Sequence, residues 1–291
     1  MAYSGIFAQD FNNEEPAMFK HERVSVKRSL QNACLPVIVV IFCVFAAPAS
    51  AQSSSDMAHE EYEAALKLEP NLENGRALYG QCAVCHDPEG WGRRSGIYPQ
   101  IAGQLPNVII KQLADIRAGN RGNPMMYPFA SGRILKSAQD IVDVATYVSQ
   151  LPMTLDNGKG SRSRAEGGKA LYEQYCTECH GAEGEGDNQE HIPLIQGQHY
   201  NYLVRQFEWI RIGRRQNADD EMAEQIQGFH SGEMRDVMSY ASYLMPPKEK
   251  LAPDDWFNPD FPKYSRDNED QFRSSTQKLT TRESDKERKN D

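Results

Sequence analysis

The pentapeptide Cys82-Ala-Val-Cys85-His86 recurs 94 residues later as Cys176-Thr-Glu-Cys179-His180, and this repetition decides the architecture. The residues around it repeat as well. Pairs with the same offset are Gly90 and Gly184, Pro99 and Pro193, Gly103-Gln104 and Gly197-Gln198, Asn107 and Asn201, Gln112 and Gln206, and Arg117 and Arg211. A repeat of this length indicates two homologous units that follow one another in the chain.

Each unit is predicted to contain three helices joined by long loops. The first helix runs into the Cys-x-x-Cys-His motif, and the second spans about 107–118 or 201–212, with a glycine just past its end. The third spans about 138–150 or 232–244, where apolar residues recur at helical spacing. No convincing alternating strand is present, so we expect an all-α fold. Units of this size bury little surface, and each needs a large apolar group to fill it.

The N-terminus has the pattern of an export signal. A basic stretch is followed by the apolar run 35–47 and by Ala49-Ser50-Ala51, which predicts a signal peptide over 1–51 that is cleaved after Ala51. A membrane anchor is the alternative, because residues 33–51 carry no charge. The acidic first 17 residues precede the basic stretch, so Met18 is the expected start.

The rest of the chain divides into a lead-in, two units, a linker and a tail. We expect the lead-in over 52–70, the units over 71–151 and 164–245, and the linker over 152–163. The tail over 246–291 is polar and mixed in charge, which predicts disorder, although Trp256 and Phe257 offer a means of attaching part of it to the surface.

The composition excludes several classes of protein. The chain has 291 residues, of which 39% are hydrophobic and 25% charged, and this fits about two globular domains. Collagen-like, fully disordered and polytopic membrane proteins are excluded. The net charge of -9 argues against a protein that mainly neutralises nucleic-acid phosphates.

The Cys-x-x-Cys-His motif is the signal for covalent attachment of haem c. Two thiols add to the haem vinyl groups, and the adjacent histidine presents its imidazole to the iron. Two such motifs predict two haem c groups, attached through Cys82, Cys85, Cys176 and Cys179, with His86 and His180 as iron ligands. Structural disulfides would leave the histidines unexplained. A zinc site would need the pairs roughly 15–20 residues apart, and a thioredoxin-like dithiol would need a strand–helix context.

The sixth iron ligand is expected to be methionine, the usual partner of histidine in electron-transfer cytochromes c. Met126 stands 40 residues after the first motif histidine and Met222 stands 42 residues after the second, while Met125 remains an alternative to Met126. Met234 and Met238 follow the helical period and are expected in the core. Histidine ligation of the second iron is a further alternative, through His191, His199 or His230.

Over about residues 70–245 the chain resembles the diheme cytochrome c4 group of bacterial periplasmic electron carriers. The resemblance rests on the two haem motifs, the runs 99–104 and 193–198 and the methionine loops. It implies two cytochrome c domains, each of about three helices around a covalent haem. It also implies electron transfer from a quinol-oxidising complex or a dehydrogenase to a terminal oxidase or reductase, with loose membrane association as an option. Asp87 in place of glycine, the polar loop around Met222 and the tail after Pro247 depart from the pattern.

An electron carrier needs no general acid or base, and the sequence shows neither a hydrolytic triad nor paired carboxylates, so we expect no enzyme activity. The alternatives are a diheme oxidoreductase of the peroxidase or sulfur-compound type, and a dedicated cytochrome subunit of a dehydrogenase complex. The basic clusters Arg93-Arg94 and Arg211…Arg214-Arg215 either hold haem propionates, guide docking or form a solvated surface. The donor, the acceptor, the haem potentials and the oligomeric state do not follow from the sequence.

Overall fold

The computed structural model describes residues 52–262. The predicted signal peptide and residues 263–291 lie outside the described residues. Within the described range the chain forms helices, and its β-structure is limited to two isolated bridges. The predicted all-α fold is confirmed.

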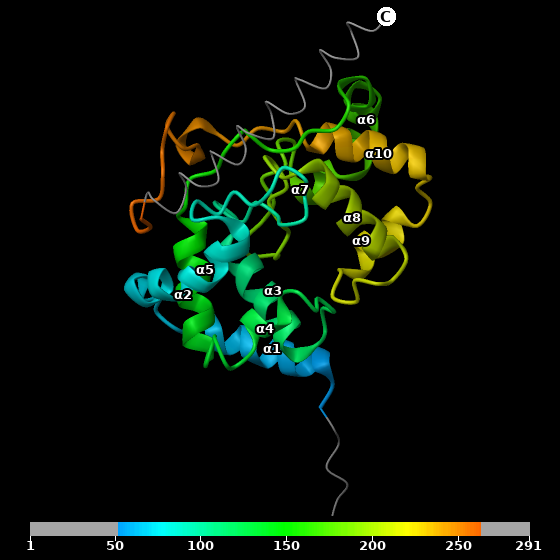
Figure 1. The fold of residues 1–291 in the computed structure, drawn as a ribbon. Coiled ribbons are helices and arrows are strands. Elements are labelled where there is room, and N and C mark those ends of the chain that lie inside the picture. Colours follow the sequence, from blue (N-terminus) through cyan, green and yellow to red (C-terminus); the bar gives the residue numbers. More distant parts are fainter. Residues whose placement is uncertain (1–51, 263–291) are drawn as a thin grey trace, which may run out of the picture. The chain divides into compact units, whose positions relative to one another are not determined.

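The first domain is built on the pairing of α2 (Leu72–His86) with α5 (Ala138–Ser149), across which α3 (Pro106–Ala118) packs. A short helix, α4 (Tyr127–Ala130), packs on α3 (Figure 1). Gly119 ends α3 in the left-handed conformation, as predicted. The core between these helices includes Tyr79, Ile110, Ile141 and Ala145.

The second domain repeats this arrangement. Helix α6 (Arg162–Tyr175) packs against α10 (Ser231–Ala241), α8 (Tyr200–Arg211) takes the place of α3, and α9 (Asp220–Ile226) packs on α8. The haem motif occupies a separate short helix, α7 (Thr177–His180). Met234 and Met238 are buried in the core of this domain, which confirms their predicted packing role.

A glycine allows the closest helix crossing in each domain. A Cβ atom on Gly75 of α2 would overlap the carbonyl oxygen of Asp143 on α5. A Cβ atom on Gly168 of α6 would overlap the carbonyl oxygen of Asp236 on α10 in the same way. Both crossings therefore bring backbone directly against backbone, and a glycine is required at each.

The expected lead-in contains a helix that the sequence reading did not foresee, α1 (Ser54–Ala65). Ser53 and Asp56 form a capping box at its N-terminus. The helix packs on α3, and Glu61 pairs with Arg117. The same arginine donates to the carbonyl oxygens of Ala130 and Leu135. None of the described helices has both the length and the apolar character needed to cross a membrane.

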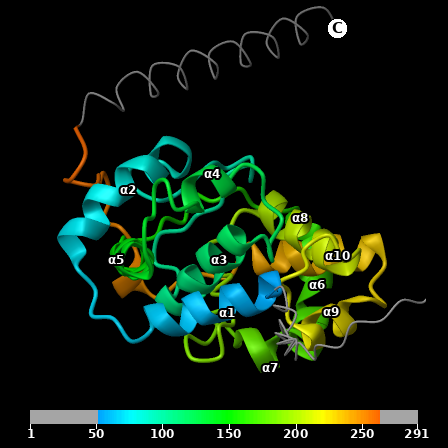
Figure 2. The ribbon, with the colours of Figure 1, turned by 90° about the horizontal axis from the view of Figure 1, so that it is seen from below.

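Residues 246–262, here called the C-terminal strap, leave α10 and return to the first domain, as both views of the ribbon show (Figures 1 and 2). The strap contains one 3₁₀ turn, Lys248–Lys250. It also makes two backbone hydrogen bonds with Met153: the Met153 amide donates to the Lys250 carbonyl, and the Ala252 amide donates to the Met153 carbonyl. Trp256 and Phe261 then pack against the first core. Trp256 thus attaches part of the tail to the first domain, as the sequence offered, and residues 246–262 are packed rather than disordered because aromatic contacts outweigh their polar composition.

Candidate functional site

The first haem motif forms the last turns of α2. His86 is buried, and its Nδ1 lies 3.0 Å from the carbonyl oxygen of Pro99. A carbonyl oxygen only accepts, so Nδ1 carries the proton and Nε2 keeps its lone pair. Burial lowers the pKa of His86, although the bond to Pro99 opposes this shift. The side chain is therefore a neutral imidazole held in one orientation, as a metal-binding histidine requires.

The second motif repeats this geometry. His180 is buried, its Nδ1 lies 3.0 Å from the carbonyl oxygen of Pro193, and burial lowers its pKa. Pro193 stands 94 residues after Pro99, so histidine and acceptor keep the same spacing in both domains. The chain thus presents two equivalent imidazoles, each oriented by a proline carbonyl.

One inserted residue, Tyr175, distinguishes the two motifs. In the first domain Gln81 directly precedes Cys82, whereas Tyr175 stands between Gln174 and Cys176 in the second. Helix α2 continues through its motif, but the helical run of the second domain breaks at Cys176 between α6 and α7.

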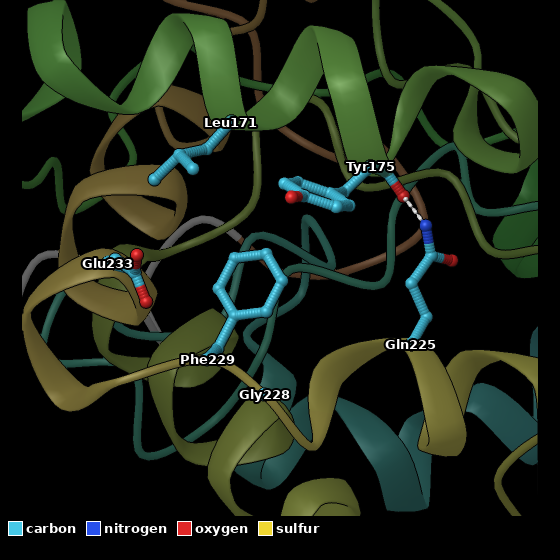
Figure 3. Close-up of a pocket in the computed structure, with 6 residues that line it drawn as sticks. All are labelled: Leu171, Tyr175, Gln225, Gly228, Phe229 and Glu233. Atoms are coloured by element: carbon cyan, nitrogen blue, oxygen red, sulfur yellow. Dashed lines mark hydrogen bonds between the residues drawn. The ribbon is translucent and has the colours of Figure 1, made fainter.

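Tyr175 borders a pocket of about 200 Å³ next to the second motif (Figure 3). Its ring packs edge-on against Phe229 at 5.3 Å between centroids, and its carbonyl accepts from Gln225 Nε2 at 2.7 Å. The rest of the lining is Leu171, Gly228 and Glu233. The insertion therefore ties the segment before Cys176 to α9 and to the connection between α9 and α10.

The four motif cysteines form no disulfide with one another in the described part of the chain. Burial raises the pKa of Cys82 to about 12, and that of Cys176 also to about 12. The described residues contain only two isolated β-bridges, so the strand–helix context of a thioredoxin-like dithiol is absent from them. In the described part of the chain no cluster of three or more His, Cys, Asp or Glu side chains is placed to hold a metal ion.

The two candidate methionine ligands lie at the starts of equivalent short helices, Met126 as the N-cap of α4 and Met222 in the first turn of α9. Met126 is half-buried at the start of α4, while Met125 is 54% exposed. Met222 lies in the first turn of α9, where its amide donates to Asp219 Oδ1 at 3.0 Å. It packs against the second core together with Cys176. In each domain the methionine helix packs on the middle helix, α3 or α8.

At the contact between the two domains, a glutamine side chain of each domain bonds to the backbone of the other. The Gln100 amide donates to Gln198 Oε1 at 3.0 Å, and Gln198 Nε2 donates to the Gln100 carbonyl at 2.8 Å. Gln104 Nε2 donates to the Leu194 carbonyl at 2.8 Å, and the Leu194 amide donates to Gln104 Oε1 at 3.0 Å. Leu194 is the repeat equivalent of Gln100, and Gln198 that of Gln104. The interface is thus self-complementary, like that of a two-fold dimer.

Two equivalent arginines lie at the same interface. Arg121 donates to Gln112 Oε1 at 2.8 Å and to Gln206 Oε1 at 3.1 Å. Arg215, 94 residues later, donates to the same two oxygens, at 3.2 Å and 3.1 Å. Burial, and then the neighbouring Arg121, lowers the pKa of Arg215 to about 9.

Among the ion pairs of the described residues, neither guanidinium has a carboxylate partner within 4.0 Å. Arg121 is buried and Arg215 half-buried, and two neighbouring cations with neutral acceptors are costly unless anions join them. The buried Asp115 carboxylate nearby supplies one negative charge for the two guanidinium groups. The interface therefore has the charge needed to receive the carboxylates of haem groups.

Comparison with known proteins decides the family. The cytochrome c family model matches residues 72–152 and, a second time, residues 165–244. The chain belongs to the cytochrome c family. Its two domains carry two covalent haem c groups, in the tandem arrangement of cytochrome c4.

Individual relatives agree with this assignment. The chain is 32% identical over 165 residues to cytochrome c4 of Azotobacter vinelandii, covering 51% of this chain and 76% of that protein. It matches the crystal structure of reduced cytochrome c4 from Pseudomonas stutzeri with a TM-score of 0.53 and 26% identity, over 60% of this chain and all of that one. It is also 28% identical over 194 residues to a "thiosulfate dehydrogenase electron acceptor" of Stutzerimonas stutzeri, which covers 60% of this chain and 88% of that protein.

The histidines considered as alternative ligands of this cytochrome have other contacts. His199 is 1% exposed; its Nδ1 accepts from the Gly158 amide at 3.1 Å, and its Nε2 lies 2.8 Å from the Trp91 carbonyl. His191 contacts Tyr62 of α1. His230 is exposed at the N-terminus of α10. His199 could reach an iron only by giving up a buried hydrogen bond.

The arginine clusters noted in the sequence divide between surface and interface. Arg94 pairs with Asp156 at 2.9 Å and is mostly exposed, and Arg211 pairs with Glu208 at 2.8 Å. Of these clusters, Arg215 joins the buried interface network. Its partner Arg121 was missed by the sequence reading, although the repeat offset of 94 residues connects the two.

Proposed function

We propose that the protein is a periplasmic diheme electron carrier. The observation that carries the proposal is the repeated His–Pro carbonyl geometry within two domains that both match cytochrome c. In this proposal the residues that attach the haems are Cys82, Cys85, Cys176 and Cys179, and those that bind the two irons are His86 with Met126 and His180 with Met222.

The bound haem supplies reversible one-electron iron chemistry, and the chain controls its surroundings. The Pro99 and Pro193 carbonyls hold each imidazole in one tautomer and orientation. Arg121 and Arg215 would provide the counter-charge for haem carboxylates at the domain interface. Because the two arginines share the same glutamine acceptors, both counter-charges would act within one region of the interface.

The partners follow from the class of protein. We propose a quinol-oxidising complex or a dehydrogenase as electron donor, and a terminal oxidase or reductase as acceptor. The name of the Stutzerimonas relative supports a dehydrogenase as donor. The export signal predicted over residues 1–51 supports a periplasmic location, with loose membrane association as an option.

Ligand substitution tests the proposed sites. Met126→Ala should lower the potential of the first haem and make it high-spin or water-ligated, because thioether sulfur favours ferrous iron. Met222→Ala should do the same to the second haem only. Met125→Ala and Met234→Ala are the matched controls, which should keep both irons six-coordinate. The core variant Met234→Ala should cost about 2–5 kcal/mol of stability.

Redox titration and visible spectra of these variants provide the measurement. A Met222→Ala protein with unchanged potential, combined with loss of the second low-spin signal in His199→Ala, would contradict the methionine assignment. Intact mass of the exported protein should show two haems, and fewer than two would contradict the proposal as a whole.

The spectrum of the unmodified protein separates a carrier from an enzyme. A diheme oxidoreductase needs one iron with an open or displaceable site, whereas a carrier keeps both irons six-coordinate and low-spin. Two low-spin haems with a methionine–iron band at the red end of the visible range support the carrier. A high-spin component supports the enzyme, and stable co-purification with a catalytic subunit supports a dedicated subunit.

A further inference from the structure

We propose that the C-terminal strap positions the histidine of the first haem and thereby makes the two haems of this protein unequal. The inference rests on the proposed function, since it takes His86 as an iron ligand. The family model ends at residue 244, so the strap is an addition to the matched domains.

The strap clamps the turn that follows His86. Asn258 is 1% exposed; its Nδ2 donates to the Pro88 carbonyl at 2.7 Å, and its amide donates to Glu89 Oε1 at 3.2 Å. Trp256 packs against Trp91 with ring centroids 5.8 Å apart. Backbone and ring contacts together hold the turn at both of its ends.

Phe261 extends this contact to α2 itself. Its ring packs edge-on against Tyr79 at 5.7 Å between centroids, and the Tyr79 hydroxyl donates to the Asp87 carbonyl at 2.7 Å. Asp87 has a positive φ of 65°, a conformation that a non-glycine residue adopts only where its surroundings hold it. The strap therefore supports the residue next to the iron ligand from a second side.

The turn after His86, which the strap holds, also fixes the position of the Pro99 carbonyl that accepts from the His86 side chain. Trp91 is followed by Gly92, whose amide donates to the His86 carbonyl at 2.9 Å. A Cβ atom on Gly92 would overlap the Pro99 carbonyl oxygen, so the two backbones lie in direct contact there. A shift of Trp91 would move Gly92 and with it the Pro99 oxygen that orients the imidazole.

The second domain has the same backbone contacts between the motif histidine, the glycine and the proline, but different residues lie over the turn. The Gly186 amide donates to the His180 carbonyl at 2.9 Å, and a Cβ atom on Gly186 would overlap the backbone next to Pro193. Glu185 stands where the first domain has Trp91, and Glu183 where it has Glu89; both are exposed. The turn after His180 is therefore in contact with water, whereas Asp87 and Glu89 are buried.

Burial around a haem and hydrogen bonding to its axial ligand are two means by which a protein sets haem potential. Water next to the proximal turn stabilises the ferric state, which carries one more positive charge than the ferrous state. Loosening the strap should thus lower the potential of the first haem and leave the second haem unchanged.

The test uses the full-length holoprotein with both haems confirmed by mass. Trp256→Ala removes the ring contact with Trp91, and Trp256→Phe restores an aromatic contact there. Asn258→Ala removes the bond to the Pro88 carbonyl and keeps the backbone amide bond to Glu89. Lys248→Ala, in the same strap but with an exposed side chain, is the matched control. The potential of each haem is measured by redox titration followed through resolved haem methyl resonances in the NMR spectrum, with the second haem as internal reference.

We expect a lower potential for the first haem in Trp256→Ala and Asn258→Ala, recovery in Trp256→Phe, and no change in Lys248→Ala. Equal shifts in the potentials of both haems would overturn the inference. An unchanged potential of the first haem in Trp256→Ala, or in Asn258→Ala, would also overturn it. If Trp256→Ala does not fold, Asn258→Ala decides alone. Loss of a haem from the unmodified protein would instead contradict the proposed function, so the two failures are distinguishable.

Discussion

The two domains orient their motif histidines identically, yet they surround them differently. Each histidine lies 3.0 Å from a proline carbonyl at the same sequence spacing. Around the first histidine, α1 and the C-terminal strap add packing from outside the repeat. Next to the second histidine, Tyr175 is inserted where the helical run breaks between α6 and α7, and the turn after His180 is exposed. Ligand geometry is therefore encoded within a short segment, while the environment of each site depends on additions to the repeat.

The largest effect is expected where the domains are alike, at the glycine crossings. Gly75→Ala or Gly168→Ala forces a methyl group onto a backbone carbonyl that cannot rotate away. We expect a loss of about 3 kcal/mol, the upper end of overpacking, confined to the domain that carries the change. Chemical denaturation followed at each haem measures it.

Neighbouring glycines serve as controls for that comparison. Gly80 and Gly167 lie on the same two helices, and a Cβ atom on either meets no atom within 4 Å. Changing them to alanine should stabilise the helix by about 0.5–1 kcal/mol. A Gly168→Ala protein as stable as Gly167→Ala would show that the crossing is looser than described.

A smaller effect is expected at the interface, where two equivalent glutamines make the same three hydrogen bonds but differ in burial. Gln198 is buried and exchanges bonds with the Gln100 backbone while accepting from the His199 amide; Gln104 is only half-buried. Because a buried group that loses its partner costs about 1–3 kcal/mol, Gln198→Ala should destabilise the contact between domains by about 2 kcal/mol. Gln104→Ala should cost about half of that. Calorimetry should show a larger separation between the unfolding temperatures of the two domains in Gln198→Ala than in Gln104→Ala. A larger separation in Gln104→Ala would contradict the description.

The smallest effect concerns a feature of the first domain alone. Ser53→Ala removes the side-chain oxygen that accepts from the Asp56 amide at 3.1 Å in the capping box of α1. We expect a loss of about 1 kcal/mol, seen as faster hydrogen exchange of α1 amides. The amides of α6 and α10 provide the reference, and faster exchange there as well would mean that α1 stabilises both domains.

The repeated elements could be predicted from the sequence because their signals are local. The range predicted for the third helix of the first domain, 138–150, differs by one residue from α5, since periodic apolar residues and a buried core agree there. The third helix of the second domain ends at Ala241 rather than near 244. The inserted Tyr175 was readable as well, because the repeat offset changes from 93 residues at Gly75 and Gly168 to 94 at the motif.

The additions could be predicted only in part, through Trp256, because their stability depends on distant partners. Helix α1 buries only Ala58, Tyr62 and Ala65, so its short apolar face is weak in the sequence, although Ser53 and Asp56 mark its start. In the strap, Asn258 looks like an ordinary polar tail residue, and its burial depends on Tyr147 and Pro88, more than a hundred positions earlier. Arg121 and Arg215 likewise acquire their environment only when the domains meet.

The self-complementary interface has a consequence for kinetics. Two separate copies with such a surface would associate only as far as their concentration allowed. Here the segment between α5 and α6 joins them, and Asn157 within it donates to the carbonyls of Gln198 and Ser242, each at 2.9 Å. A short tether sets an effective concentration in the millimolar range. Electron exchange between the two haems should therefore follow first-order kinetics at any dilution, with a rate that does not depend on how much protein is present.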